Sequence, residues 1–153
     1  MKKARILILA IFLIFSLWTI SDTAPTRYKF LSTDITVPIN TTYVEGTDFT
    51  SKQIMLAYAK NASVTFYVKG NNASCSKDVI FKFATFDSLR NKWDTADVLN
   101  EGLGVSITAN GTTAVQKTIA IEADLERLKL LSVQNQETIS GYTVDVNVSI
   151  FIK

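Results

Sequence analysis

Strict alternation of apolar and polar residues near the C-terminal end most constrains how this 153-residue chain folds. From residue 144 to residue 152, one face carries valine or isoleucine at every second position, and the other carries Asp145, Asn147 and Ser149. A period of two is that of a half-buried β-strand, because successive side chains point to opposite sides of a sheet. We therefore expect a strand with one buried apolar face and one polar face toward solvent.

Shorter alternating or apolar runs recur along the chain, each the length of a strand. They occupy residues 53–59, 64–68, 79–86, 105–108 and 115–121. With the C-terminal run and a strand near residue 35, they give seven or eight short strands separated by turns. No repeat or Gly/Pro/Ser linker interrupts the series, and a 47% apolar composition is enough for one core. We predict an all-β chain with a single Ig-like β-sandwich of 7–8 strands.

Three local signals refine this prediction. Asn110-Gly111 predicts a hairpin between its flanking strands, because both residues tolerate positive φ. The polar residues 87–103 predict a long loop with a helical turn. Leucines at helical spacing over residues 123–131 predict a short helix.

The first 21 residues differ in composition from the rest. Lys2, Lys3 and Arg5 precede mostly apolar residues over 6–20, which is the layout of a secretory signal peptide. A helix of about 15 such residues reaches about 22 Å, short of the roughly 30 Å hydrocarbon core of a bilayer. We predict a hydrophobic signal helix cleaved near Ser21, with a retained membrane anchor as the alternative. In both cases, we expect the chain from about residue 22 to lie outside the cytoplasm.

Charge and composition exclude several classes of function. Once Lys2, Lys3 and Arg5 are removed from the 16 basic residues, 13 remain against 14 acidic ones, a net charge of −1. No basic cluster is left, so we expect no nucleic-acid partner. The chain has no histidine, which removes His-based acid–base catalysis, Ser-His-Asp hydrolysis and His-containing zinc sites. We predict no enzyme activity and no cofactor.

The remaining candidates for chemistry are few. Oxygen-bearing side chains gather in one loop at Asp87, Asn91, Asp94, Asp97 and Glu101. Their spacing matches no EF-hand, so we interpret them as a solvated loop rather than a Ca²⁺ site, and we assign no catalytic or metal residue. Cys75 is the sole cysteine and cannot form an internal disulfide. We expect a free thiol there, with pairing between subunits as the alternative.

Asn-x-Ser/Thr sequons occur five times, whereas nine asparagines in this composition give about two by chance. Asparagines in such triplets accept N-linked glycans in secreted proteins. Together with the targeting segment, this number predicts N-glycosylation. The expected sites are Asn40, Asn61, Asn72, Asn110 and Asn147.

Residues 22–41 form an N-terminal arm ahead of the sandwich domain predicted over 42–153. On one face of the arm, at strand spacing, fall Leu31, Thr33, Ile35, Val37 and Ile39. Pro38 lacks an N–H, which places this strand at a sheet edge or near its end. One interpretation is the first strand of the sandwich. The other is a donor strand that completes the sheet of a neighbouring copy, with residues 41–50 as a hinge.

A secretion signal, an extended arm, a small Thr/Asn-rich β-sandwich, dense sequons and few charges resemble the secreted donor-strand filament subunits of archaea, of the thread and bundling-pilus type. The resemblance covers the whole chain in layout and rests on no sequence signature. It implies a glycosylated extracellular fibre used in adhesion or biofilm. It differs from chaperone–usher pilins, which usually carry a disulfide that one cysteine cannot form internally.

We therefore predict a structural subunit of an extracellular filament, a head-to-tail homopolymer assembled by donation of residues 28–40. Its partners would be other copies of the chain and N-linked glycans, with membrane contact only through residues 6–20 if these are retained. The alternative is a monomeric, cell-surface-anchored β-sandwich for binding or adhesion. A third possibility is a secreted or membrane-associated accessory protein, a class that includes viral envelope proteins.

Overall fold

The computed structural model describes residues 25–57, 59, 61–94, 104–121 and 125–153. Within these ranges the chain forms eleven β-strands and no helix, which confirms the all-β prediction. The predicted signal or anchor over residues 1–21 lies outside the described residues. Among those described, no helix could span a bilayer.

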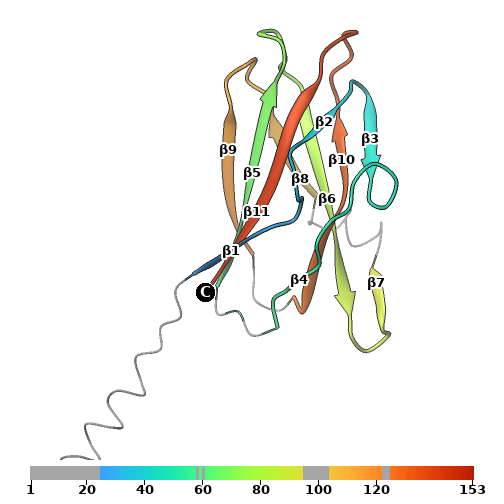
Figure 1. Ribbon diagram of the computed structural model, residues 1–153, viewed down its shortest axis with the longest axis vertical. Helices are drawn as coiled ribbons and strands as arrows, with labels where there is room; N and C mark the ends of the chain where they lie inside the picture. Colours follow the sequence, from blue (N-terminus) through green and yellow to red (C-terminus); the bar gives the residue numbers. More distant parts are fainter. Residues whose placement is uncertain (1–24, 58, 60, 95–103, 122–124) are drawn as a thin grey trace, which may run out of the picture.

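The strands form two antiparallel sheets packed face to face (Figure 1). Across the first sheet the order is β1 (Thr26–Lys29) and β2 (Ile35–Val37), then β11 (Val144–Ile152), β5 (Ala62–Gly70) and β9 (Val115–Ile121). Across the second sheet it is β3 (Thr41–Val44) and β4 (Ile54–Met55), then β10 (Arg127–Asn135), β6 (Asp78–Asp87), and β7 (Lys92–Asp94) with β8 (Gly104–Thr108). β1 and β2 follow one another along the same edge of β11.

The strand order is that of a jelly roll. Three pairs of short strands (β1 with β2, β3 with β4, β7 with β8) each share one edge position, so the eleven strands fill eight positions. Numbered along the chain, these positions run 1-8-3-6 in the first sheet and 2-7-4-5 in the second. The predicted sandwich is confirmed, but its Ig-like order is wrong, since the first and second positions lie in opposite sheets. The first and last positions are neighbours instead.

The core lies between the sheets and follows the predicted alternation. In β11 the inward residues Val144, Val146, Val148 and Ile150 are fully buried. The ring of Phe66 from β5 lies across the gap, with its centroid 5.0 Å from that of Phe81 and 6.0 Å from that of Phe83, both in β6. Aromatic pairs at such distances and angles add to the stabilisation that area burial provides.

The loop predicted over 87–103 contains a strand, β7, which pairs with the end of β6, and its residues beyond 94 lie outside the described part of the chain. Two other local predictions fail because pairing between distant segments decides the structure. The helix predicted over 123–131 is wrong: β10 begins at Arg127 and pairs with strands on both sides. Its buried residues Leu128 and Leu130 follow a period of two. At Asn110-Gly111 the turn forms, with φ of 57° at Gly111, but β8 and β9 enter different sheets, so it joins no hairpin.

Four loops meet at one end of the sandwich, which we call the loop end: residues 38–40, 71–77, 109–114 and 136–143. The buried carboxylate of Glu137 joins two of them, since its Oε1 accepts hydrogen bonds from the N–H groups of Ser76 (2.5 Å) and Lys77 (2.7 Å). The N–H of Asn40 donates to the carbonyl of Glu137 at 2.9 Å. These bonds fix how the chain turns from the first sheet into the second.

Cys75 is buried beneath the same end rather than displayed in a polar loop. Its thiol is free, and the residue is 1% exposed. A Cβ added at Gly70 would lie 2.6 Å from the Cβ of Cys75, so the backbone of β5 approaches this side chain closely. A disulfide to another copy would require this end of the sandwich to open.

Candidate functional site

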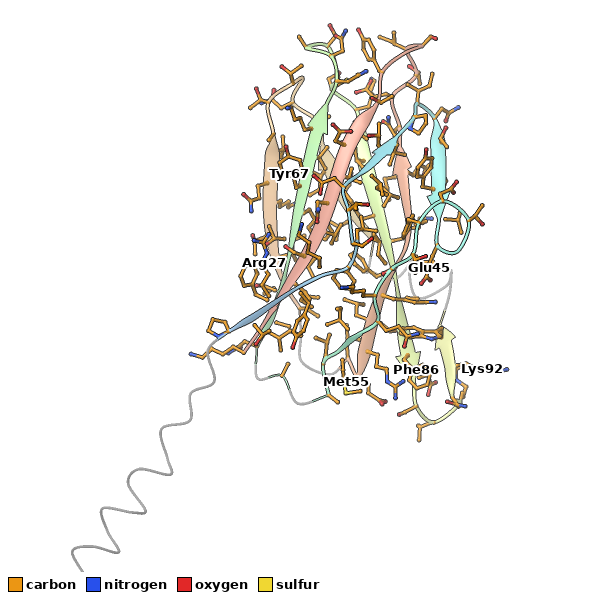
Figure 2. The ribbon with its side chains drawn as sticks, viewed as in Figure 1. Arg27, Glu45, Met55, Tyr67, Phe86 and Lys92 are labelled. Atoms are coloured by element: carbon orange, nitrogen blue, oxygen red, sulfur yellow. The ribbon has the colours of Figure 1, made fainter. Side chains whose placement is uncertain are left out.

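Polar side chains form rows across the outer face of the first sheet. They point outward because they alternate with the buried residues of the same strands. In one row, from β1 through β11 and β5 to β9, stand Lys29, Ser149, Thr65 and Thr118. The next row contains Asn147, Tyr67 and Gln116. Figure 2 shows Arg27 and Tyr67 on the side of the first sheet, and Glu45 and Phe86 on that of the second.

Short side chains in the middle of these rows leave a hollow with a volume of about 220 Å³. The sandwich strands contribute Thr65, Tyr67, Gln116, Asn147 and Ser149, and the arm contributes Arg27, Lys29 and Asp34. Thr65 and Ser149 are buried in its floor, where the hydroxyl oxygens of Thr65 and Thr118 lie 2.9 Å apart. The lining therefore combines hydroxyls, amides, one aromatic ring and three charged groups.

Three side-chain hydrogen bonds fasten the arm to the outer face of β11. Arg27 Nη2 donates to Ser149 Oγ at 3.2 Å, Asn147 Nδ2 donates to Asp34 Oδ1, and Thr36 Oγ1 donates to Asp145 Oδ1 at 2.5 Å. The guanidinium of Arg27 also lies 5.3 Å from the ring centroid of Phe151. Every outward residue of β11 from 145 to 149 thus has a partner on the arm. We call these three bonds the outer ladder.

The inner side of the arm differs from the single alternating strand that the sequence predicts. Between Lys29 and Ile35 the arm advances six residues, while β11 advances three, from Val146 to Ser149. The extra residues form a bulge that turns both Phe30 and Leu31 into the core. Of the predicted interface residues, Leu31 and Val37 are buried, Ile35 and Ile39 are half-buried, and Thr33 is exposed.

The five predicted glycosylation sites occupy different surroundings. Asn40, Asn72 and Asn110 are exposed in three turns of the loop end, and Asn61 is exposed ahead of β5 at the opposite end. Asn147 is half-buried within β11 and lines the hollow. The alternation placed it on the polar face as predicted, but this face is covered in part by the arm.

Among the residues weighed as Ca²⁺ ligands, Asp87 has a structural role in the described part of the chain. Asp87 closes the turn between β6 and β7: its carboxylate accepts hydrogen bonds from the N–H groups of Leu89 and Arg90 and from Arg90 Nε. These bonds, chiefly that from the Arg90 side chain, lower the pKa of Asp87. Asp97 and Glu101 lie outside the described residues. Within the part of the chain that is described, no three Asp, Glu or Cys side chains could hold a metal ion.

The outer face of the second sheet carries a different set of side chains, in which Lys129 and Arg127 already have partners. Lys129 Nζ lies 4.8 Å from the ring centroid of Trp93 and 2.7 Å from the carboxylate of Glu45. The guanidinium of Arg127 lies 4.5 Å from the ring centroid of Phe86. Stacked and paired cations of this kind stabilise a surface. We therefore place the candidate site on the first sheet.

The hollow is the part of the site that sequence reasoning missed. One signal for it was present: Asn147 and Ser149 are two residues apart in a strand and must share a face. The other lining residues come from β1, β5 and β9, and only the pairing of those strands brings them to β11.

Comparison with known proteins shows likeness of fold alone. No family model and no curated protein matches the sequence. Among solved structures, the CBM36-1 domain of a multidomain xylanase from the hindgut metagenome of Trinervitermes trinervoides is 11% identical (TM-score 0.44, covering 84% of this chain and 96% of that one). The K1 cleaved adhesin domain of Lys-gingipain from Porphyromonas gingivalis is 13% identical (TM-score 0.42, covering 85% and 98%). PRD1 vertex protein P5 is 12% identical (TM-score 0.39, covering 82% and 93%).

Proposed function

We propose that this chain is an extracellular surface module that binds a saccharide in the hollow of its first sheet. The observation that carries the proposal is the lining of the hollow. Saccharide hydroxyls donate and accept hydrogen bonds at once; hydroxyl and amide side chains can satisfy both roles, and a carboxylate can accept from a sugar hydroxyl. Thr65, Gln116, Asn147 and Asp34 supply such groups, while the ring of Tyr67 offers an apolar surface for the C–H face of a sugar.

The size of the hollow limits what it holds. Its volume of about 220 Å³ is below the roughly 300–1,000 Å³ of pockets that enclose a drug-sized ligand. A single sugar ring, at the end of or within a longer chain, suits this space better than an extended oligosaccharide. An extracellular position agrees with the targeting pattern over residues 1–21 and with the exposed sequons at Asn40, Asn72 and Asn110.

A titration of the mature chain with a panel of neutral and acidic monosaccharides, followed by NMR, tests this proposal. We expect chemical shift changes at Tyr67 and Gln116, and at least a tenfold loss of affinity in Tyr67→Ala. Phe86→Ala, which removes a half-buried aromatic from the outer face of the second sheet, is the matched control and should bind as the unaltered chain does. If no sugar binds, or if Tyr67→Ala and Phe86→Ala weaken binding equally, the proposal is wrong.

A second candidate function, the donor-strand filament subunit predicted from the sequence, is favoured by the anchoring of the arm. Phe30, Leu31 and Val37 are 0%, 1% and 0% exposed, so this short segment supplies three fully buried side chains to the core. The hinge predicted over residues 41–50 is wrong at its start, since residues 41–44 form β3. Only residues 38–40 join the arm to β3, and they include Pro38 and an Asn40 with φ of 43°. A short, strained connection favours exchange of a terminal strand between copies. A head-to-tail exchange that does not close gives a filament.

Lengthening this connection tests the second candidate. We expect the unaltered chain to form filaments in negative-stain electron microscopy. Two residues inserted between Ile39 and Asn40 should favour the arm in its own sheet and yield monomers. The same insertion after Gly141, in another loop of the same end where a Cβ would meet nothing within 4 Å, is the control. Discrete monomers from the unaltered chain, or filaments from the lengthened one, would reject strand donation.

A further inference from the structure

The charged residues that line the hollow all belong to the arm. Arg27 and Lys29 come from β1, and Asp34 comes from the segment between β1 and β2. The sandwich strands contribute only uncharged groups, among them Tyr67 and Gln116. Without the arm, the hollow would lose one wall and every full charge it has.

Two of these charges are already engaged with the floor. Arg27 donates to Ser149, and Asp34 accepts from Asn147. Lys29 stands in the same row as Ser149 and is exposed, with no hydrogen bond or ion pair among the described residues. Its ammonium group is therefore available to a ligand, and the two cations outnumber the one carboxylate of the lining.

We propose that the arm completes the site and selects a saccharide that carries a carboxylate, so that binding the sugar fastens the arm. This inference rests on the proposed saccharide site and names both its ligand class and its effect. The carboxylate of the sugar would lie near Lys29 and Arg27, while its hydroxyls contact Tyr67, Gln116 and Asn147. In an exchanged assembly, the arm of one copy would complete the hollow of the next.

Sugar binding and docking of the arm are coupled because the ligand binds one state of the arm and not the other. A ligand that contacts the arm and the sandwich together binds the docked arrangement and not the one with the arm released. It therefore stabilises docking by the factor 1 + [L]/Kd. At a ligand concentration ten times Kd, release of the arm becomes about tenfold rarer. By reciprocity, a loosened arm weakens ligand binding by the same factor.

Hydrogen exchange on the full mature chain tests the coupling, with glucuronic acid as the acidic probe and glucose as the neutral one. The reporter is the N–H of Phe30, which donates to the carbonyl of Val148 at 3.0 Å and is freed when the arm leaves. We expect glucuronic acid at ten times Kd to slow exchange at Phe30 about tenfold, with no change in β9. Lys29→Ala should weaken glucuronic acid roughly tenfold, because a bond to a charged group is lost. Lys77→Ala, which removes an exposed lysine of the loop end that does not line the hollow, should not.

The possible results distinguish the coupling of the arm to the sugar from the saccharide site itself. If glucuronic acid perturbs Tyr67 and Gln116 but leaves exchange at Phe30 unchanged, the saccharide site stands and the coupling is wrong. If glucose binds as tightly as glucuronic acid and Lys29→Ala has no effect, the selection of an acid is wrong. If neither sugar binds, the proposed function fails and the inference fails with it.

Discussion

The first sheet has one edge made by the arm and another made by β9, and the two edges differ in how readily they would pair with a strand of another chain. The arm edge is attached by inward side chains, Phe30, Leu31 and Val37, and by the outer ladder on the opposite face. Within the part of the chain that the structure describes, β9 pairs with β5 alone, and its residues are exposed or half-buried. An apolar anchor makes a strand part of the core, whereas β9 closes the sheet with little burial.

Lys117 is the residue of β9 that would oppose the pairing of this edge with a further strand. It occupies an inward register position, opposite the fully buried Phe66, where an apolar residue would be expected. An inward-pointing charge on an edge strand opposes pairing with another edge, because pairing would bury it. The arm edge of the first sheet therefore favours the addition of a strand, whereas the β9 edge opposes it.

Truncating one inward side chain on each edge should give the largest difference between the two edges, in the free energy of unfolding. Phe30→Ala creates a cavity beside Phe83, whose ring centroid lies 5.4 Å from that of Phe30. We expect a loss of about 3–5 kcal/mol in the free energy of unfolding, measured by urea denaturation. Ile119→Ala on β9 removes a half-buried side chain and should cost about 1–2 kcal/mol. Equal losses would mean that the two edges are anchored alike.

Replacing the charge of Lys117 on the β9 edge with an apolar side chain gives the second test. Lys117→Val should allow β9 to pair with another copy, which would appear as larger species in size-exclusion chromatography with light scattering. Lys117→Arg keeps the charge and is the control. If Lys117→Val matches the unaltered chain in size at the same concentration, the charge is not what protects this edge.

A smaller effect is expected on glycan occupancy at Asn147, which contacts the arm. The amide of Asn147 donates to Asp34, whereas Asn72 lies in an exposed turn. In a secreting host that adds N-linked glycans, we expect lower occupancy at Asn147 than at Asn72, measured by glycopeptide mass spectrometry. Asp34→Ala should raise occupancy at Asn147 and leave Asn72 unchanged. Full occupancy at Asn147 in the unaltered chain would contradict the arrangement of the outer ladder.

The β8 edge of the second sheet gives the smallest expected effect, which depends on pH. Asp78 accepts a hydrogen bond from Thr108 Oγ1 at 2.6 Å, and this bond, followed by one from Ser106, lowers the pKa of Asp78. A carboxylate whose pKa is lowered by folding stabilises the folded state at pH values above its unfolded-state pKa, which is near 4. This stabilisation is lost as the pH falls from there through the lower pKa of the folded state. Urea midpoints should therefore fall below about pH 4, and Asp78→Asn should make this dependence weaker. An unchanged dependence in the variant would assign the acid sensitivity to other groups.

Much of the sandwich could be predicted because its strands are amphipathic on their own. The alternation in β5 and β11 identified Val64, Phe66, Val148 and Ile150 as core residues, and all four are buried. The strand order could not be predicted in this way, since an inward valine is compatible with any neighbour. Leucines at helical spacing misled the prediction for β10, because pairing with β6 and β3 determines its conformation.

The candidate site was harder to predict than the core. Its side chains come from β1, β5, β9 and β11, and the distance between them in the sequence exceeds 100 residues for Arg27 and Ser149. The bulge at Phe30 and Leu31 also had no signal, because an alternating pattern in the sequence extended through it. Both features depend on the register between the arm and β11.

The pairing of β1 with β11 has a mechanical consequence. Thr26 stands opposite Ile152, and Figure 1 shows the start of β1 beside the C-terminus. A pull that separates these two points would peel the ladder apart one residue pair at a time, which resists force poorly. In an exchanged assembly the pull would instead enter the arm from its β3 end, where Val37 stands opposite Val144, and would leave the body at the start of its own β3, at the same end of the sandwich. Exchange would therefore move the point at which the arm begins to separate from β11, from Thr26 at one end of the ladder to Val37 at the other.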